Sequence, residues 1–241
     1  MEKGKTTDLS FYSNELQEQV QILVYTPPQF TPLNKYAYCI AQDGKDYFQL
    51  GRIARTIDEL LYNGEIEPIL FFGIPYQNVA DRRKKYHPLG SMQKQYMRFL
   101  VYELIPFIEE RFPVLHMGQS RALAGDSLAA TISLLTALEY PHTFGKIMLH
   151  SPYVDENVIN AVNHFSNGDL LTAYHVIGKE ETFVKMTNGE TADFLTPNRT
   201  LSKSLTNNIA DYFYDEFDGN HTWKYWQKDI KRALTFLFPN E

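Results

Sequence analysis

The stretch Ala124-Gly125-Asp126-Ser127-Leu128-Ala129-Ala130 constrains the fold of this chain more than any other part of its sequence. A short apolar run leads into it, and a strongly helical run over residues 128–138 follows it. A serine between small residues at such a junction is typical of a sharp strand-to-helix turn, in which Gly125 and Ala129 leave room for the Ser127 hydroxyl to project. The helix start would direct free N–H groups and its positive dipole end to the same place. Ser127 is therefore a candidate nucleophile, and a turn without chemistry is the alternative.

Short β-like runs alternate with longer helical patterns along the chain, which predicts an α/β fold with a mostly parallel central sheet and helices on both faces. Helical stripes of apolar residues are expected over residues 48–61, 96–107 and 223–238. Because ligands of open α/β sheets bind outside the carboxyl ends of the strands, the loops at those ends are expected to converge. The expected strands cover residues 20–25, 36–41, 68–73, 122–125, 146–150, 173–178 and 211–217.

Composition limits the class of protein. With 241 residues, of which 44% are hydrophobic, the chain is expected to form one domain over residues 1–241, and residues 1–18 are interpreted as a loosely ordered N-terminal extension. A net charge of −6 argues against nucleic acid or a membrane surface as partner. The start of the chain is polar, and no stretch has the roughly 20 apolar residues of a transmembrane helix, so a cytoplasmic location is expected.

Cysteine and histidine usage narrows the chemistry further. Cys39, the single cysteine, lies in an expected buried strand, where it is interpreted as a small hydrophobe rather than a catalytic thiol. No histidine pair has the spacing of a metal motif such as H-E-x-x-H, so no metal site and no cofactor are expected. A homo-oligomer is left open.

A serine nucleophile needs a base, and the base needs an acid that orients it. Of seven histidines, His221 follows the last expected strand and precedes the last expected helix, which makes it the candidate base. His87 is the main rival, but it lies upstream of Ser127, and loop placement is the simpler interpretation of it. His150 ends an expected strand, and both a pocket-lining and a purely structural role are open for it.

The acid is expected in the loop after the strand over residues 173–178. Glu181 is the candidate and the adjacent Glu180 is the first alternative, since neighbouring side chains point in different directions and only one is expected to reach His221. Asp193 is a third, weaker candidate. A glutamate in this place would hold the imidazole tautomer and stabilise the imidazolium.

An oxyanion hole needs two backbone N–H donors. The first is expected from Leu128, directly after the nucleophile. The second is expected from the loop over residues 42–48, where Gly44 permits close backbone approach and Lys45 or Asp46 donates. A plain turn at this glycine is the alternative.

Several blocks, in this order along the chain, resemble the esterase family of α/β-hydrolases that includes enterochelin esterases and esterase D-type hydrolases. The similarity runs from about residue 20 to the C-terminus, and it implies the α/β-hydrolase fold and serine esterase activity. Two departures from the family pattern are Ala129, where many relatives have glycine, and Lys85, where they have an acidic residue. The blocks include Gln42-Asp43-Gly44, Arg82 with Tyr86-His87-Pro88, Arg121-Ala122-Leu123-Ala124-Gly125-Asp126-Ser127, and Gly219-Asn220-His221-Thr222-Trp223 with Trp226.

These observations favour a serine carboxylic-ester hydrolase that acts through an acyl-enzyme on a small or medium ester. An acyltransferase on the same triad and a non-catalytic binding protein on a hydrolase scaffold are the alternatives. The basic run at residues 82–85 is interpreted as a solvated loop face, with contact to an anionic substrate as the other interpretation. The candidate substrate-binding residues are Arg82, Tyr76, Tyr153 and Trp223.

Overall fold

Eight strands form one sheet in the order β1-β2-β4-β3-β5-β6-β7-β10, in a computed structural model that describes residues 1–187 and 189–240. β1 pairs antiparallel with β2 and β2 with β4, and every pair from β4 to β10 is parallel. The prediction of a mostly parallel sheet is therefore confirmed. The strands are β1 (Lys5–Ser13), β2 (Glu18–Thr26), β3 (Ala37–Gln42), β4 (Ile69–Ile74), β5 (Arg121–Asp126), β6 (Lys146–His150), β7 (Thr172–Gly178) and β10 (Asp211–Phe217).

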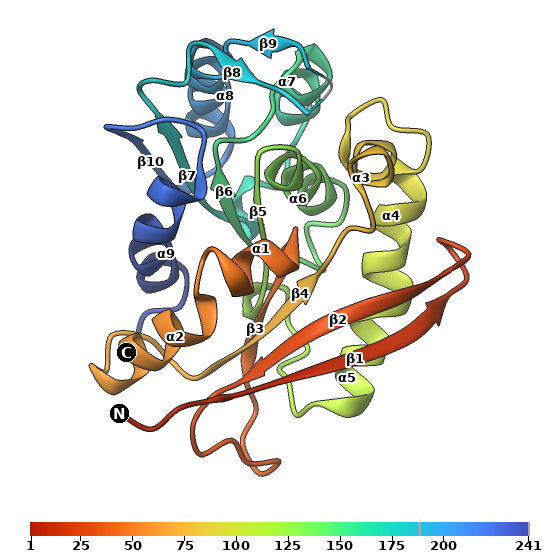
Figure 1. The fold of residues 1–241 in the computed structure, drawn as a ribbon, viewed down its shortest axis with the longest axis vertical. Coiled ribbons are helices and arrows are strands. Elements are labelled where there is room, and N and C mark those ends of the chain that lie inside the picture. The colour runs from red at the N-terminus through yellow and green to blue at the C-terminus, as the bar shows by residue number, and fades with distance from the viewer. Residues whose placement is uncertain (188, 241) are drawn as a thin grey trace.

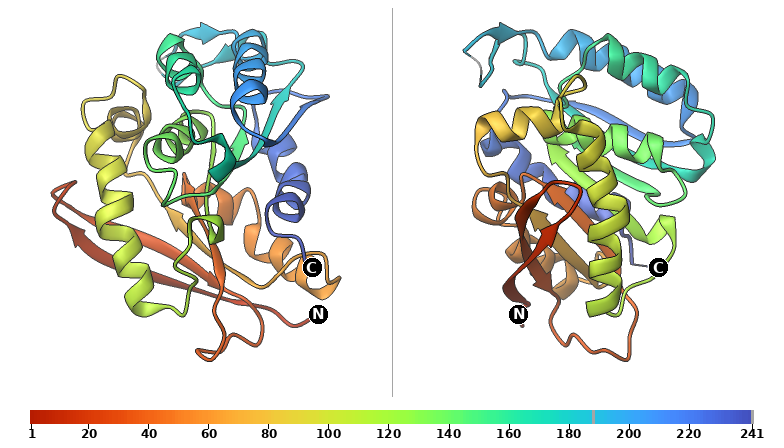
Figure 2. Two further views of the ribbon diagram at one scale, coloured as in Figure 1. Left: turned by 180° about the vertical axis from the view of Figure 1, so that it is seen from behind. Right: turned by 90° about the vertical axis from the view of Figure 1, so that its right-hand side faces the viewer.

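Helices cover both faces of the sheet (Figure 1). On one face α1 (Gly44–Gln49), α2 (Ile53–Tyr62) and α9 (Trp223–Leu237) pack on the strands through side chains such as Ile57 and Ile230. The view from behind in Figure 2 shows the other face, where α4 and α5 run on as one long helix. The elements of that face are α3 (Val79–Tyr86), α4 (Gln93–Phe99), a π-helical stretch (Leu100–Leu104), α5 (Ile105–Arg111), α6 (Leu128–Glu139), α7 (Glu156–Asn163) and α8 (Leu195–Asn208).

The structure corrects the expectations at several places. The prediction of a loosely ordered N-terminal extension over residues 1–18 is wrong, because residues 5–13 form β1, whose Leu9 and Phe11 pack against the core. The helix expected over residues 48–61 is two helices, since the backbone turns at Arg52, which has a φ of 52°. A small second sheet pairs β8 (Val184–Lys185) with β9 (Thr191–Ala192), and short 3₁₀ turns lie at Gly118–Ser120 and Gly168–Leu170.

The carboxyl ends of the parallel strands lie at one edge of the sheet, as expected. Asp126 at the end of β5 is in register with His150 at the end of β6, and Gly178 at the end of β7 is in register with Phe217 at the end of β10. The loops that follow these strands carry the candidate site. None of the helices in the described ranges is long and apolar enough to cross a bilayer.

Candidate active site

The turn between β5 and α6 has the sharp geometry that its small residues predict. Ser127 has φ 54° and ψ −126°, a region that side chains other than glycine rarely occupy and that is concentrated at functional sites. Its N–H donates to the carbonyl of His150 at 2.9 Å, and its carbonyl accepts from Thr131 at 3.1 Å. A Cβ atom at Gly125 would lie 2.2 Å from the backbone of Ala129. Only glycine therefore fits at that position of the turn.

Glu181, rather than Glu180, contacts His221. The Nδ1 atom of His221 lies 2.6 Å from Oε2 of Glu181, whose side chain is fully buried, whereas Glu180 is exposed. A buried carboxylate is stable where hydrogen-bond donors surround it. The other oxygen, Oε1, accepts from the N–H of Gly178 at 2.8 Å and from the hydroxyl of Ser151 at 2.6 Å. These contacts fix the carboxylate at the imidazole.

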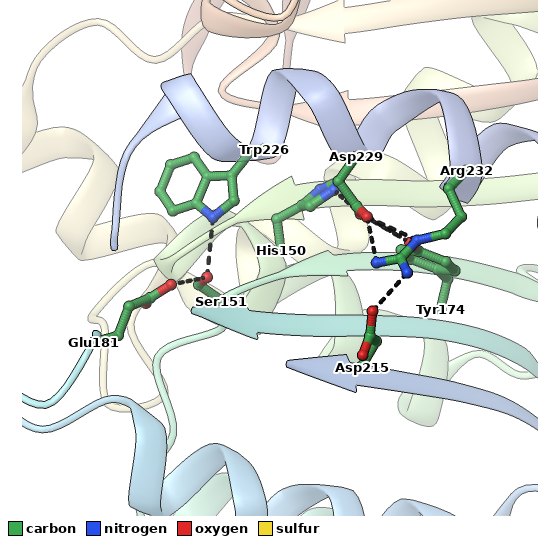
Figure 3. A network of polar contacts seen from close by, with 8 residues as sticks. All are labelled: His150, Ser151, Tyr174, Glu181, Asp215, Trp226, Asp229 and Arg232. Carbon is green, nitrogen blue, oxygen red and sulfur yellow. Dashed lines mark hydrogen bonds and ion pairs between the residues drawn. The ribbon is translucent and has the colours of Figure 1, made fainter. Parts of the chain in front are cut away.

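Ser151 and Trp226 complete this arrangement, and the residue pattern did not assign a role to either. The indole Nε1–H of Trp226 donates to the Ser151 hydroxyl at 3.0 Å, and the same hydroxyl donates to Glu181 (Figure 3). The Trp226 ring also packs edge-on against His221, with ring centres 4.8 Å apart. Ser151 directly follows β6, so the rule that loops at the carboxyl ends of strands converge could have drawn attention to it.

Asp229 on α9 fixes the helix that carries Trp226. Its carboxylate lies 3.0 Å from Nε2 of His150 and accepts from the Tyr174 hydroxyl at 2.9 Å, as Figure 3 shows. Arg232 donates to the same carboxylate at 2.6 Å and to Asp215 at 2.5 Å. The His150 side chain therefore points toward α9, which favours the structural role over the pocket-lining one.

Ser127 and His221 line one cavity of about 90 Å³. Of the four candidate substrate-binding residues, Arg82 and Tyr153 line this cavity and Tyr76 and Trp223 do not. Tyr76 lines a separate cavity beside β2, and Trp223 packs its ring edge-on against Tyr47 at 4.9 Å between ring centres. The other lining residues are Leu128, Arg83, Val184, Lys185, Met186, Thr187 and Phe194.

The segment after β3 begins a short helix instead of the expected loop. Gly44 packs so closely on β4 that a Cβ atom would lie 2.2 Å from the Gly73 backbone, which confirms that the glycine serves close approach. The N–H of Asp46 donates to the carbonyl of Asp43 at 2.9 Å. Because that N–H is already bonded, Asp46 was the wrong candidate for the second oxyanion donor, and Gly44 and Lys45 remain.

The basic run at residues 82–85 belongs to α3 and not to a loop, and only Arg83 and Lys84 are solvent-exposed as expected. Arg82 and Lys85 are three residues apart and both face inward. Lys85 contacts Glu18 at 2.6 Å and Asp81 at 2.8 Å, so it joins α3 to β2 and lies outside the lining of the Ser127 cavity. Arg82 pairs with Asp43.

Two other candidate groups lack an active environment. The His87 ring lies 5.2 Å from the Tyr153 ring, and burial together with the nearby Arg83 charge lowers the pKa of His87. Cys39 is buried in β3, and this burial raises the pKa of its thiol, which agrees with a structural role. Within the residues described here, no group of three or more histidine, cysteine, aspartate or glutamate side chains is arranged to hold a metal ion.

Comparisons with known proteins identify the family and the fold of the chain. Residues 13–237 match the model of the family described as "Putative esterase". The chain is 47% identical to the YjcH protein of Bacillus subtilis (strain 168), described as uncharacterized, over 96% of each chain. It is 22% identical to an acetyl esterase of Caldicellulosiruptor saccharolyticus over 95% of this chain and 96% of that one.

A solved structure of the enterobactin esterase FES from Shigella flexneri superimposes with a TM-score of 0.84 at 16% identity. The match covers 97% of this chain and 58% of that chain, so the chain spans little more than half of that esterase. At this identity the likeness establishes the α/β-hydrolase fold. The chain therefore belongs to the "Putative esterase" family of α/β-hydrolases, a membership that supports ester hydrolysis.

Proposed function

We propose that this protein is a serine carboxylic-ester hydrolase in which Ser127 is the nucleophile, His221 the general base and Glu181 the orienting acid. The observation that carries the proposal is the strained Ser127 turn, which shares a cavity with a histidine whose Nδ1 lies 2.6 Å from a buried glutamate. A side chain that has an unfavourable backbone conformation and faces a cavity together with a base fits nucleophilic catalysis.

In the first half of the reaction, Ser127 Oγ attacks the ester carbonyl while His221 Nε2 takes the hydroxyl proton. Glu181 accepts the Nδ1–H of His221 and so keeps Nε2 free as the acceptor. The negative charge that develops on the carbonyl oxygen is stabilised by the N–H of Leu128 at the start of α6 and by an N–H of the Gly44–Lys45 segment at the start of α1. Collapse of the tetrahedral intermediate releases the alcohol, which receives the proton from His221.

In the second half, a water molecule attacks the acyl-enzyme with His221 again acting as the base, and the acid product leaves. The cavity volume of about 90 Å³, equal to about three water molecules in the liquid, favours a small acyl group. Its walls include Leu128, Tyr153 and Phe194, which suit an apolar acyl chain.

The test is steady-state hydrolysis of p-nitrophenyl acetate and butyrate by the purified wild type and by Ser127→Ala. The wild type is expected to turn over both esters, and the variant is expected to lose at least about 10⁴-fold in kcat. Asp8→Asn, an exposed change on β1, is the matched control and should retain full activity. Undiminished turnover by Ser127→Ala would refute the proposal.

A further inference from the structure

Arg82 lines the cavity, but its positive charge is already paired with the carboxylate of Asp43. Its Nε donates to both carboxylate oxygens of Asp43, at 2.9 and 2.8 Å, and its Nη2 donates to Oδ2 at 2.5 Å. The two side chains are only 9% and 2% exposed. Nη2 also lies 3.4 Å from the carbonyl oxygen of Asp126, the residue before the nucleophile. One guanidinium thus links the segment after β3 to the end of β5.

The segment after β3 has an unfavourable backbone conformation at Asp43, directly before the candidate oxyanion donors. Asp43 has φ 55° and ψ 36°, in the left-handed region, and caps α1 without a side-chain hydrogen bond to that helix. Such conformations persist where the surrounding structure fixes them. The two remaining donor candidates, the N–H groups of Gly44 and Lys45, follow directly along the chain, and their directions depend on the torsion angles of Asp43. Two side chains hold Asp43 in place: Arg82 pairs with its carboxylate, and Tyr86 forms a hydrogen bond with its backbone.

We propose that Arg82 is a positioning residue for the oxyanion hole, acting through Asp43 on the N–H groups of the Gly44–Lys45 segment. The inference rests on the proposed function, since it concerns the stabilisation of the same tetrahedral intermediate. It also replaces the interpretation of Arg82 as a substrate-binding cation. A planar guanidinium that is buried and bound by two parallel contacts to a carboxylate has its charge neutralised and is poorly available to an anionic ligand.

The contacts of Arg82 with Asp43 and Asp126 require the planar, forked shape of a guanidinium group. A lysine at position 82 would keep one positive charge beside Asp43, but it would lack the fork that contacts both oxygens and the Asp126 carbonyl together. Loss of one oxyanion donor lowers kcat by about 100- to 1,000-fold, and a displacement of about 1 Å lowers it by about 100-fold. Arg82→Lys is therefore expected to lower kcat by about 10- to 100-fold while KM stays within about twofold.

The experiment compares kcat and KM of the wild type, Arg82→Lys and Lys84→Gln on p-nitrophenyl acetate, with thermal melts to verify folding. Lys84 is exposed on the same helix and outside the cavity lining, so its change removes a charge without the proposed effect. The rate of Ser127 phosphonylation by a fluorophosphonate provides a second readout. That rate should fall with kcat in Arg82→Lys, because it needs the same oxyanion donors.

A second set of variants guards against loss of folding when one charge is left alone. Arg82→Met combined with Asp43→Asn removes both charges, and the double variant should be no slower than the worse single variant. Wild-type kcat in Arg82→Lys, or a raised KM with kcat unchanged, would overturn the inference while ester hydrolysis by the wild type still stands. Absence of wild-type turnover would instead refute the proposed function, and this inference with it.

Discussion

Ser151→Ala removes a hydroxyl that lies outside the lining of the Ser127 cavity, yet the structure predicts a measurable loss of activity. The hydroxyl donates to Oε1 of Glu181 at 2.6 Å and thereby helps to hold Oε2 against His221. Ser151 has a φ of 49°. Alanine is strained there about as much as serine, so the substitution tests the hydroxyl and leaves the backbone conformation unchanged.

The magnitude follows from the contacts of the carboxylate. A hydrogen bond to a charged group contributes about 1.5–3 kcal/mol. The N–H of Gly178 still donates to the same oxygen at 2.8 Å, so the lower end applies. If the loss is felt mainly in the transition state, where His221 becomes positively charged, about 1.5 kcal/mol corresponds to roughly a tenfold lower kcat.

The assay is steady-state hydrolysis of p-nitrophenyl acetate, together with the pH dependence of kcat/KM, which reports the titration of the essential base. Ser151→Gly is the matched control, because it also lacks the hydroxyl but relieves the positive φ. It should lose as much kcat as Ser151→Ala and melt at a higher temperature than that variant. A kcat of Ser151→Ala within about twofold of the wild type would refute the idea that this hydroxyl orients Glu181.

Three further predictions concern the indole, the turn and a buried histidine. Trp226→Phe removes the donor to the Ser151 hydroxyl and should lower kcat less than Ser151→Ala, by about two- to threefold in the same assay. Gly125→Ala should abolish ester hydrolysis and lower the melting temperature, since its Cβ would clash with the backbone of α6, whereas Ala129→Gly should keep activity. Burial lowers the pKa of His175 from 6.5 to about 4, so the unfolded chain binds the proton first as the pH falls. Between pH 6.5 and 4 the free energy of unfolding should therefore drop by about 3 kcal/mol, and chemical denaturation of His175→Gln should show a flatter dependence on pH.

The fold was readable where the sequence pattern is local. β3, β5 and β7 are short apolar runs buried on both faces, and such runs bounded by turn residues identify central strands. The sequence pattern did not predict β1, because this edge strand has a largely exposed outer surface and its alternation of Leu9 and Phe11 with polar residues is weak. The pattern also did not predict α8, because threonine, serine and asparagine dominate the sequence of this helix.

The order of the candidate site residues along the chain could be predicted from the sequence. The hydrogen bonds that orient their side chains could not. Ser127, Glu181 and His221 each follow a predicted strand, so strand order alone placed them at one edge of the sheet. The contacts that orient them join residues far apart in sequence, as between Ser151 and Trp226. The pairing of Arg82 with Asp43 is of the same kind, since which partner a buried guanidinium meets depends on how α3 packs on the sheet.

The choice between Glu180 and Glu181 also needed the structure. Neighbouring residues in a loop point in different directions, and which of them faces inward depends on the turn after β7. There the N–H of Glu181 donates to the Gly178 carbonyl at 3.1 Å, and that of Glu180 donates to Gly219 at 2.9 Å. With these hydrogen bonds in place, the Glu181 carboxylate points toward His221, and the Glu180 side chain is exposed to solvent.

A covalent adduct on Ser127 would identify this residue as the nucleophile of an ester hydrolase. The purified protein is treated with a fluorophosphonate, digested and sequenced by mass spectrometry, while residual ester hydrolysis is followed in parallel. We expect one phosphonyl group on Ser127, with hydrolysis lost in proportion to labelling and no adduct in Ser127→Ala. Loss of hydrolysis with the label on another residue, or full hydrolysis by fully labelled Ser127, would contradict this assignment.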